Sequence, residues 1–175
     1  MYRPTDKMVA GCVITEEYAV AVSADRLWKV SFSGSYKDAL PKACAGFIDA
    51  VDIEGDGGPG SITTMSLSPA AAAATGAAAG VMRSRIVARD DAARVVKSEV
   101  LEGGKVAAQL KSQVLETRIE EAGEGSCVVK LRMEYERLDG GGELAAEDQA
   151  ALAGSYMGLL KKVEAYLVAN PAEYA

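Results

Sequence analysis

The sequence predicts an α+β fold in which an antiparallel sheet is followed by one long helix. Apolar and polar residues alternate through a series of short segments, and turn residues separate these segments, as in strands joined by hairpins. Residues 143–169 then change to a helical period. Because the strands follow one another directly and the helices lie towards the ends of the chain, the pattern differs from that of a doubly wound sheet.

One strand and two short helices are predicted in the N-terminal part. Residues 11–22 alternate loosely between apolar and polar side chains, as expected of a first strand. Ser23 is a suitable N-cap for a short helix over residues 24–30. Residues 33–35 interrupt this helix, and residues 36–44 predict a second one.

A glycine-rich turn joins two further strands, predicted over residues 47–53 and 61–67. A Walker loop would need Gly-Lys-Ser/Thr at the start of a helix, and a dinucleotide-binding loop must also lead into a helix. No lysine and no helical pattern follow here, so we expect the turn to shape a hairpin. The turn consists of Gly55, Asp56, Gly57, Gly58, Pro59 and Gly60.

An alanine-rich segment and two more strands come next. Residues 69–80 have neither an apolar stripe nor a charged face, so we expect a connector whose conformation the pattern leaves open. Within residues 82–89 the even positions share one face and the arginines, including Arg89, share the other. Further strands are expected at residues 94–101 and within residues 106–119.

The last strand and the long helix have the clearest patterns. In the last strand, apolar side chains from Val129 to Tyr135 alternate with charged ones. The glycines at 140–142 end the sheet, and residues 143–169 carry an apolar stripe that Asn170 and Pro171 terminate. The stripe consists of Leu152, Tyr156, Leu159, Val163 and either Tyr166 or Leu167.

A sheet of this size offers more area than one helix covers. Inward residues can therefore line a cavity instead of closing a solid core, and small inward residues favour a cavity although they also occur in close packing. The small candidates are Ser84, Ala88, Ser98 and Ser155.

Composition and charge exclude several classes of function. The net charge of −6 argues against electrostatic capture of nucleic acid or of an anionic membrane. Histidine is absent, which removes the commonest general base, the Ser-His triads and most zinc sites. We therefore expect no nucleic-acid partner, no membrane association, no metal and no cofactor.

The cysteines and the length predict one cytoplasmic domain. Cys12, Cys44 and Cys127 lie far apart without metal-ligand spacing, which is typical of reduced thiols. No secretory signal and no bilayer-length apolar run is seen. The length of 175 residues suits a single domain over residues 1–175, in which we expect residues 1–10 to be a loose extension.

Four motifs resemble those of a known plant family. They are Ala-Asp-Arg-Leu-Trp-Lys at 24–29, the glycine-rich segment 53–62, Leu-Glu-Gly-Gly at 101–104 and the helical segment 163–169. Over residues 11–175, the motifs and the order of elements resemble the pathogenesis-related class-ten proteins, the family of the major birch pollen allergen. The alanine- and glycine-rich composition suggests a monocot member.

This resemblance implies the helix-grip (START-like) fold, in which a seven-stranded antiparallel sheet wraps around a long C-terminal helix and two short helices support it. It also implies an internal cavity for plant molecules such as cytokinins, flavonoids, sterols, alkaloid-type compounds and fatty acids, in a role linked to defence or stress. We expect a monomer or a weak dimer.

The expected partner is a hydrophobic small molecule, held by aliphatic and methionine side chains that adapt to varied shapes. Trp28, Phe32 and Leu40 are expected at the entrance, and each residue of the set could also serve as ordinary core. The full set is Trp28, Phe32, Leu40, Met65, Leu67, Met82, Ser84, Ile86, Val96, Ser98, Val100, Leu115, Tyr156 and Leu159.

An enzyme of the norcoclaurine-synthase type is an alternative within the same family. Those enzymes use a lysine, a tyrosine and a glutamate at positions that here hold Val96, Met82 and Ser84. Lys97 is adjacent, but a one-residue offset directs it to the other sheet face. A different chemistry, assisted by Glu116 or Tyr156, stays open.

Two further functions are considered. Ribonuclease activity would use a lysine after the glycine turn and a glutamate and tyrosine on the long helix. The helix pair is present as Glu164 and Tyr166, but Thr63 replaces the lysine, so a phosphodiester would lack its cationic partner. We expect Tyr166 to pack inward and Glu164 to meet backbone amides or a lysine near the glycine turn. Outside the family, the curved surface could act as an interaction module.

Overall fold

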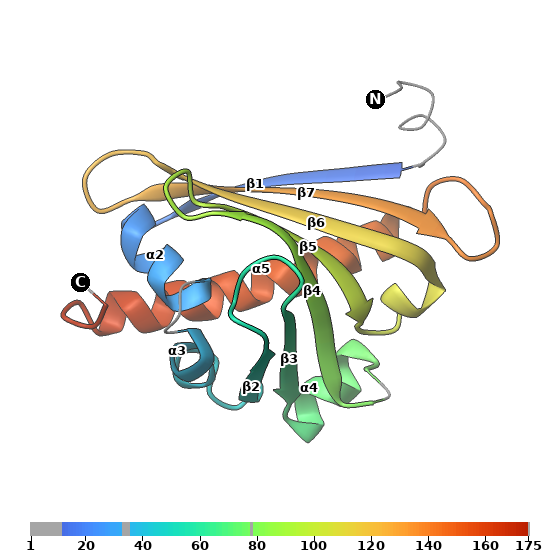
Figure 1. Cartoon of the computed structure of the whole chain (residues 1–175), viewed down its shortest axis with the longest axis horizontal. Helices are drawn as coiled ribbons and strands as arrows, with labels where there is room; N and C mark the ends of the chain where they lie inside the picture. Colours follow the sequence, from blue (N-terminus) through green and yellow to red (C-terminus); the bar gives the residue numbers. More distant parts are fainter. Residues whose placement is uncertain (1–11, 33–35, 78, 175) are drawn as a thin grey trace.

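A seven-stranded antiparallel sheet curves over one long C-terminal helix in the computed structural model (Figure 1), as predicted. The structure describes residues 12–32, 36–77 and 79–174, so the predicted extension at 1–10 lies outside the described residues. The elements are β1 (Cys12–Val20), α2 (Ala24–Ser31), α3 (Tyr36–Ala43), β2 (Ile48–Glu54), β3 (Ile62–Leu67), α4 (Pro69–Thr75), β4 (Val81–Asp90), β5 (Val95–Glu102), η1 (Ala107–Gln109), β6 (Leu110–Glu121), β7 (Cys127–Arg137) and α5 (Ala146–Ala169).

The sheet has the order β1-β7-β6-β5-β4-β3-β2, so the first strand pairs with the last. β1 and β2 therefore form opposite edges, and α2 and α3 connect these edges at one end of the molecule (Figure 1). Both short helices contact α5. The two edges, the short helices and α5 thus enclose the inner face of the sheet.

The inner face of β7 is buried as its alternation predicted. Val129, Leu131, Met133 and Tyr135 are all buried, and charged side chains occupy the other face. On that outer face Lys130 pairs with Glu120 of β6 at 2.9 Å. The period-two pattern therefore identified both faces of this strand correctly.

The helix α2 links the N-terminal part to the end of α5. The predicted cap is present, because Ser23 Oγ accepts a hydrogen bond from the Arg26 amide at 3.3 Å. The Arg26 guanidinium also donates to carbonyl oxygens at the C-terminal end of α5, where helix carbonyls lack partners. These acceptors are Leu167, Asn170 and Glu173, at 2.8–3.1 Å from Nη2.

The alanine-rich segment, whose conformation the sequence left open, contains the helix α4. Ser68 caps its start by accepting from the Ala71 amide at 3.1 Å, and Gly76 ends it with a left-handed φ of 71°. Ala71 is buried against the core. Capping and burial against the rest of the fold thus stabilise a helix that has no amphipathic pattern of its own.

A β-bulge reverses the predicted faces at the end of β4. Its register with β5 shifts between Ile86 and Ala88, which leaves one extra residue in β4. The predictions that Ala88 faces inward and Arg89 outward are therefore wrong. Ala88 is exposed, whereas Arg89 pairs with the buried Val96 and its guanidinium lies 5.6 Å from the centre of the Trp28 ring.

The helix α5 begins at Ala146, three residues later than predicted. Leu144 is buried outside the helix, and its amide donates to Tyr135 Oη at 2.9 Å. This contact ties the segment before α5 to the last strand. Asn170 ends the helix, as predicted.

Candidate functional site

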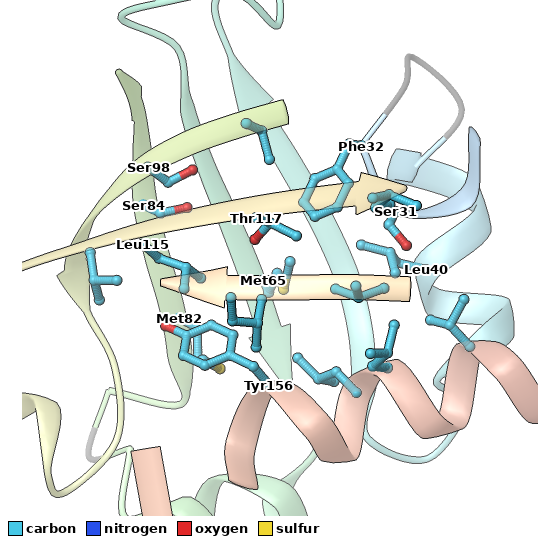
Figure 2. A pocket seen from close by; sticks show the side chains of 18 of the residues that line it. Ser31, Phe32, Leu40, Met65, Met82, Ser84, Ser98, Leu115, Thr117 and Tyr156 are labelled. Carbon is cyan, nitrogen blue, oxygen red and sulfur yellow. The ribbon is translucent and has the colours of Figure 1, made fainter. Parts of the chain in front are cut away.

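A cavity lies between the inner face of the sheet and α5, and α2 and α3 border it at one end (Figure 2). The centres of water-sized spheres can occupy about 170 Å³ of it, far more than the roughly 10–15 Å³ that one water needs. Its lining residues are Leu27, Ser31, Phe32, Leu40, Met65, Met82, Arg83, Ser84, Val96, Ser98, Val100, Glu102, Leu115, Thr117, Ile119, Val129, Leu131, Tyr156, Leu159, Leu160 and Val163.

Most residues predicted to contact a ligand line this cavity, although ligand contact itself stays a prediction. Figure 2 shows Phe32 and Leu40 on one side of the space and Tyr156 and Met82 on the other, with Ser84 and Ser98 above them. The predicted residues that line the cavity are Phe32, Leu40, Met65, Met82, Ser84, Val96, Ser98, Val100, Leu115, Tyr156 and Leu159.

Three predicted residues do not line the cavity. Leu67 and Ile86 are buried in the surrounding core. The expectation that Trp28 forms part of the entrance is also not met. Its Nε1 donates to Asp91 Oδ1 at 3.1 Å, and its ring packs against Phe32 with the ring centres 5.1 Å apart. Trp28 therefore supports the lining residue Phe32 from behind.

The predicted small inward residue Ser155 does not line this cavity but borders a neighbouring hollow beside α4. Its hydroxyl donates to the Ala151 carbonyl one turn earlier in α5, at 3.0 Å. Sequence reasoning, in turn, did not include Leu27, Thr117 and Leu131 among the lining residues. The period-two pattern could have found Thr117, which shares its face with Leu115.

The polar groups of the lining are few and mostly uncharged. Small hydroxyl side chains, such as Ser84 and Ser98, lie among aliphatic ones. Arg83 and Glu102 form an ion pair at 3.0 Å, so their charges compensate each other. Burial raises the pKa of Tyr156 to about 12, so this phenol stays protonated at neutral pH. Such a space suits a mainly apolar, uncharged molecule.

Three backbone amides of the glycine turn already have acceptors within the fold. The amide of Gly57 donates to Ser61 Oγ at 2.9 Å, that of Gly58 to Asp56 Oδ1 at 2.8 Å, and that of Gly60 to the Ile86 carbonyl at 2.8 Å. The hydrogen bond from Gly58, followed by that from Ser61, lowers the pKa of Asp56. With these three amides used and a carboxylate present, the turn forms a hairpin without a phosphate cradle.

Residues 10–170 match the sequence profile of the pathogenesis-related protein Bet v 1 family. The chain belongs to this family. No sequence match was found among curated proteins.

Solved structures of the Bet v 1 fold superpose on nearly the whole chain. Ara h 8.0201 has a TM-score of 0.72 at 21% identity, covering 91% of this chain and 99% of its own. Truncated norcoclaurine synthase from Thalictrum flavum has a TM-score of 0.63 at 23% identity, covering 91% of this chain and 94% of its own. Ginseng major latex-like protein 151 from Panax ginseng has a TM-score of 0.66 at 18% identity, covering 89% of this chain and 96% of its own. These likenesses confirm the helix-grip fold, and none supports the suggested monocot origin.

The three residues that the sequence analysis aligned with the catalytic positions of the synthases line the cavity and bring no acid-base group to it. They are Val96, Met82 and Ser84. Lys97 pairs in register with Glu116 on the opposite face. The suggestion that Glu116 assists a reaction in the pocket is therefore wrong: its neighbours Leu115 and Thr117 line the cavity, and it faces Arg118 outside, at 3.9 Å.

The helix pair considered for ribonuclease activity has structural partners. Glu164 Oε2 accepts from the Ala21 amide at 2.7 Å, as expected for a backbone contact, although this amide belongs to the β1–α2 connection and not to the glycine turn. Tyr166 packs against the core and donates to Glu173 Oε2 at 2.6 Å. Thr63 is buried and uncharged.

Within residues 12–32, 36–77 and 79–174, no helix is long and apolar enough to cross a membrane. Nor does any group of three or more His, Cys, Asp or Glu side chains in the described ranges have the proximity needed to hold a metal ion.

Proposed function

We propose that this protein binds a hydrophobic or amphipathic small molecule in the cavity between its sheet and α5, and stores or carries it in the cytoplasm. The observation that supports the proposal most is the cavity itself, because aliphatic and methionine side chains surround a space large enough for more than scattered waters. Membership of the Bet v 1 family agrees with this function.

The proposed ligand is a plant hormone, flavonoid, sterol or alkaloid-type molecule, bound in connection with defence or stress. Met65 and Met82 lie on neighbouring strands and pair in register, so two flexible thioethers adjoin one part of the wall. Methionine adapts to varied ligand shapes, which supports tolerance towards several skeletons. The lining residues predicted from the sequence are the proposed contacts.

Dye displacement tests the proposal. We expect 8-anilinonaphthalene-1-sulfonate to gain fluorescence on binding, and trans-zeatin, quercetin or a brassinosteroid to displace it. Ser98→Phe places a ring inside the cavity and should weaken dye binding about tenfold or more, through lost space.

The matched control is Lys97→Phe, which places the same ring on the opposite face of β5 and should leave displaceable binding intact. If the dye does not bind, or binds Ser98→Phe as tightly as the wild type, the proposed function is wrong and an interaction module becomes the better hypothesis.

An enzyme of the norcoclaurine-synthase type is disfavoured although the fold is shared. A condensation of dopamine with an aldehyde would need acid-base groups where Val96, Met82 and Ser84 stand. We expect no product when the protein is incubated with dopamine and 4-hydroxybenzaldehyde. Product formation that Tyr156→Phe abolishes would establish the enzyme instead.

A further inference from the structure

Gln113 of β6 meets Tyr156 of α5 at the edge of the cavity. There a second hollow of about 520 Å³, bordered by α4, the β5–β6 connection and α5, adjoins the first. The two spaces share Met82, Val100 and Tyr156 as lining residues, and Gln113 borders the second. Gln113 is only 2% exposed, and its Nε2 lies 3.4 Å from Tyr156 Oη and 3.2 Å from Met133 Sδ.

The hydrogen-bonding capacity of this pair is not used up. Gln113 Nε2 carries two protons and has two acceptors, but among the described residues Oε1 has no partner and exposes less than 1 Å². The opposite amide orientation would let Tyr156 donate to Oε1, but it would also place Oε1 3.2 Å from Met133 Sδ, where both atoms are acceptors, and leave Nε2 without a partner, so the present orientation is used here.

Tyr156, in contrast, has an unused hydrogen-bond donor. Its oxygen accepts from Gln113, and its own proton has no acceptor in the described part of the chain. Because burial raises its pKa to about 12, the hydroxyl keeps that proton at neutral pH. One acceptor and one donor of these two adjoining side chains are therefore unused beside the two hollows.

We propose that Gln113 and Tyr156 select a ligand that carries an uncharged hydroxyl group on an otherwise apolar skeleton. The ligand O–H donates to Gln113 Oε1, and the ligand oxygen accepts from Tyr156 Oη. A hydroxyl group both donates and accepts, whereas an ether or ketone only accepts. A carboxylate would meet no free cation in the main cavity, where Arg83 is paired with Glu102. This inference rests on the proposed ligand-binding function.

Three naphthalenes of similar size separate the contributions. They are 2-naphthol, which donates and accepts, 2-methoxynaphthalene, which only accepts, and 2-methylnaphthalene, which does neither. We expect isothermal titration calorimetry at pH 7 to give the tightest binding for 2-naphthol, about five- to tenfold tighter than for 2-methoxynaphthalene.

Variants assign the selectivity to the pair. Gln113→Leu should remove the preference for 2-naphthol over 2-methoxynaphthalene and leave 2-methylnaphthalene binding unchanged or tighter. Tyr156→Phe should weaken both oxygen-bearing probes relative to 2-methylnaphthalene. Gln109→Leu, the same substitution at an exposed residue of η1, should behave as the wild type. Circular dichroism and thermal unfolding check the fold, and Gln113→Met serves if Gln113→Leu is unstable.

The outcomes distinguish this inference from the proposed function. Equal affinities for the three probes in the wild type, or a preference for 2-naphthol that survives both Gln113 variants, would overturn the hydroxyl selectivity while leaving the cavity as a binding site. If none of the three probes binds the wild type or the variants, the proposed function fails and the selectivity fails with it.

Discussion

The two halves of α5 meet the same sheet in different ways. Near its N-terminal end, Leu152 and Ala153 pack into a compact cluster with Met133 and Tyr135 of β7. Further along, the inward side chains from Tyr156 to Val163 face the cavity. One helix stripe thus packs against β7 in one half, where α5 also borders the second hollow, and forms a wall of the apolar cavity in the other.

The difference lies in the strands, because the helix is apolar in both halves. Against the N-terminal half, β7 presents the large side chains Met133 and Tyr135, which fill the space next to this strand, whereas the second hollow lies beside β5, β6 and α4. Opposite the other half, β4 and β5 present Ser84 and Ser98, which leave space. The size of the side chains on β7, compared with those on β4 and β5, therefore decides where the apolar cavity lies.

Truncating one leucine in each half should separate the two regions most clearly. We expect Leu152→Ala to lower the free energy of unfolding by about 3 kcal/mol, because Leu152 is buried against Met133 and Tyr135 and loses these contacts, although it also borders the second hollow. Leu159→Ala, which only enlarges existing space, should cost about 1 kcal/mol and weaken dye binding. Urea unfolding at pH 7 measures both, and equal losses would contradict the comparison.

Enlarging a small side chain gives the opposite test. Ala153→Leu should cost about 2 kcal/mol, since the compact cluster has no room for three more carbons. Ser84→Leu should change the unfolding free energy by less than about 1 kcal/mol, because it extends into the cavity and buries apolar surface. The comparison fails if thermal unfolding shows the larger loss for Ser84→Leu.

Tyr135 tests how the compact half anchors the start of α5. Its hydroxyl accepts from the Leu144 amide, so Tyr135→Phe leaves a buried donor without its partner. We expect a loss of about 1–2 kcal/mol and faster hydrogen exchange at the Leu144 amide. An unchanged exchange rate at the Leu144 amide would show that the Tyr135 hydroxyl does not stabilise the connection between β7 and α5.

Cys44 provides a pH test of the packing beside the open half, next to Leu40 and the short helix α3. Burial raises its pKa from 9.0 to about 11, so the folded protein keeps the thiol protonated while the unfolded chain ionises it between these values. Stability is therefore complete below pH 9 and falls as the pH rises towards 11, by about 1 kcal/mol at pH 10. Cys44→Ala should reduce this loss of stability. If the variant and the wild type lose stability equally between pH 9 and 11, the buried Cys44 thiol is not its cause.

The sequence predicted the fold well where patterns are local and regular. The inward face of β7, the Ser23 cap of α2 and the hairpin at the glycine turn all follow from alternation, capping preference and turn chemistry. Many of the residues that line the cavity were also predicted, because every second residue of a strand points to the inner face of the sheet.

The remaining features depend on contacts between distant segments. The bulge near Val87 exchanges the sheet faces on which Ala88 and Arg89 lie, and no local sequence pattern indicates it. Trp28 is held behind Phe32 by Asp91 and Arg89, which lie far along the chain. An apolar side chain can serve as lining or as support, and only its neighbours decide between the two.

By itself, the sequence determined the order of elements, the apolar faces and the chemistry that is absent, including every function that needs histidine. Only the tertiary structure decided that the space under β4 and β5 is open, that the glycine turn uses its own amides, and that Gln113 Oε1 is left beside Tyr156 without a partner. The physical reason is that periodicity and capping act within a few residues, whereas cavities and unpaired polar atoms are set by what distant segments leave unfilled.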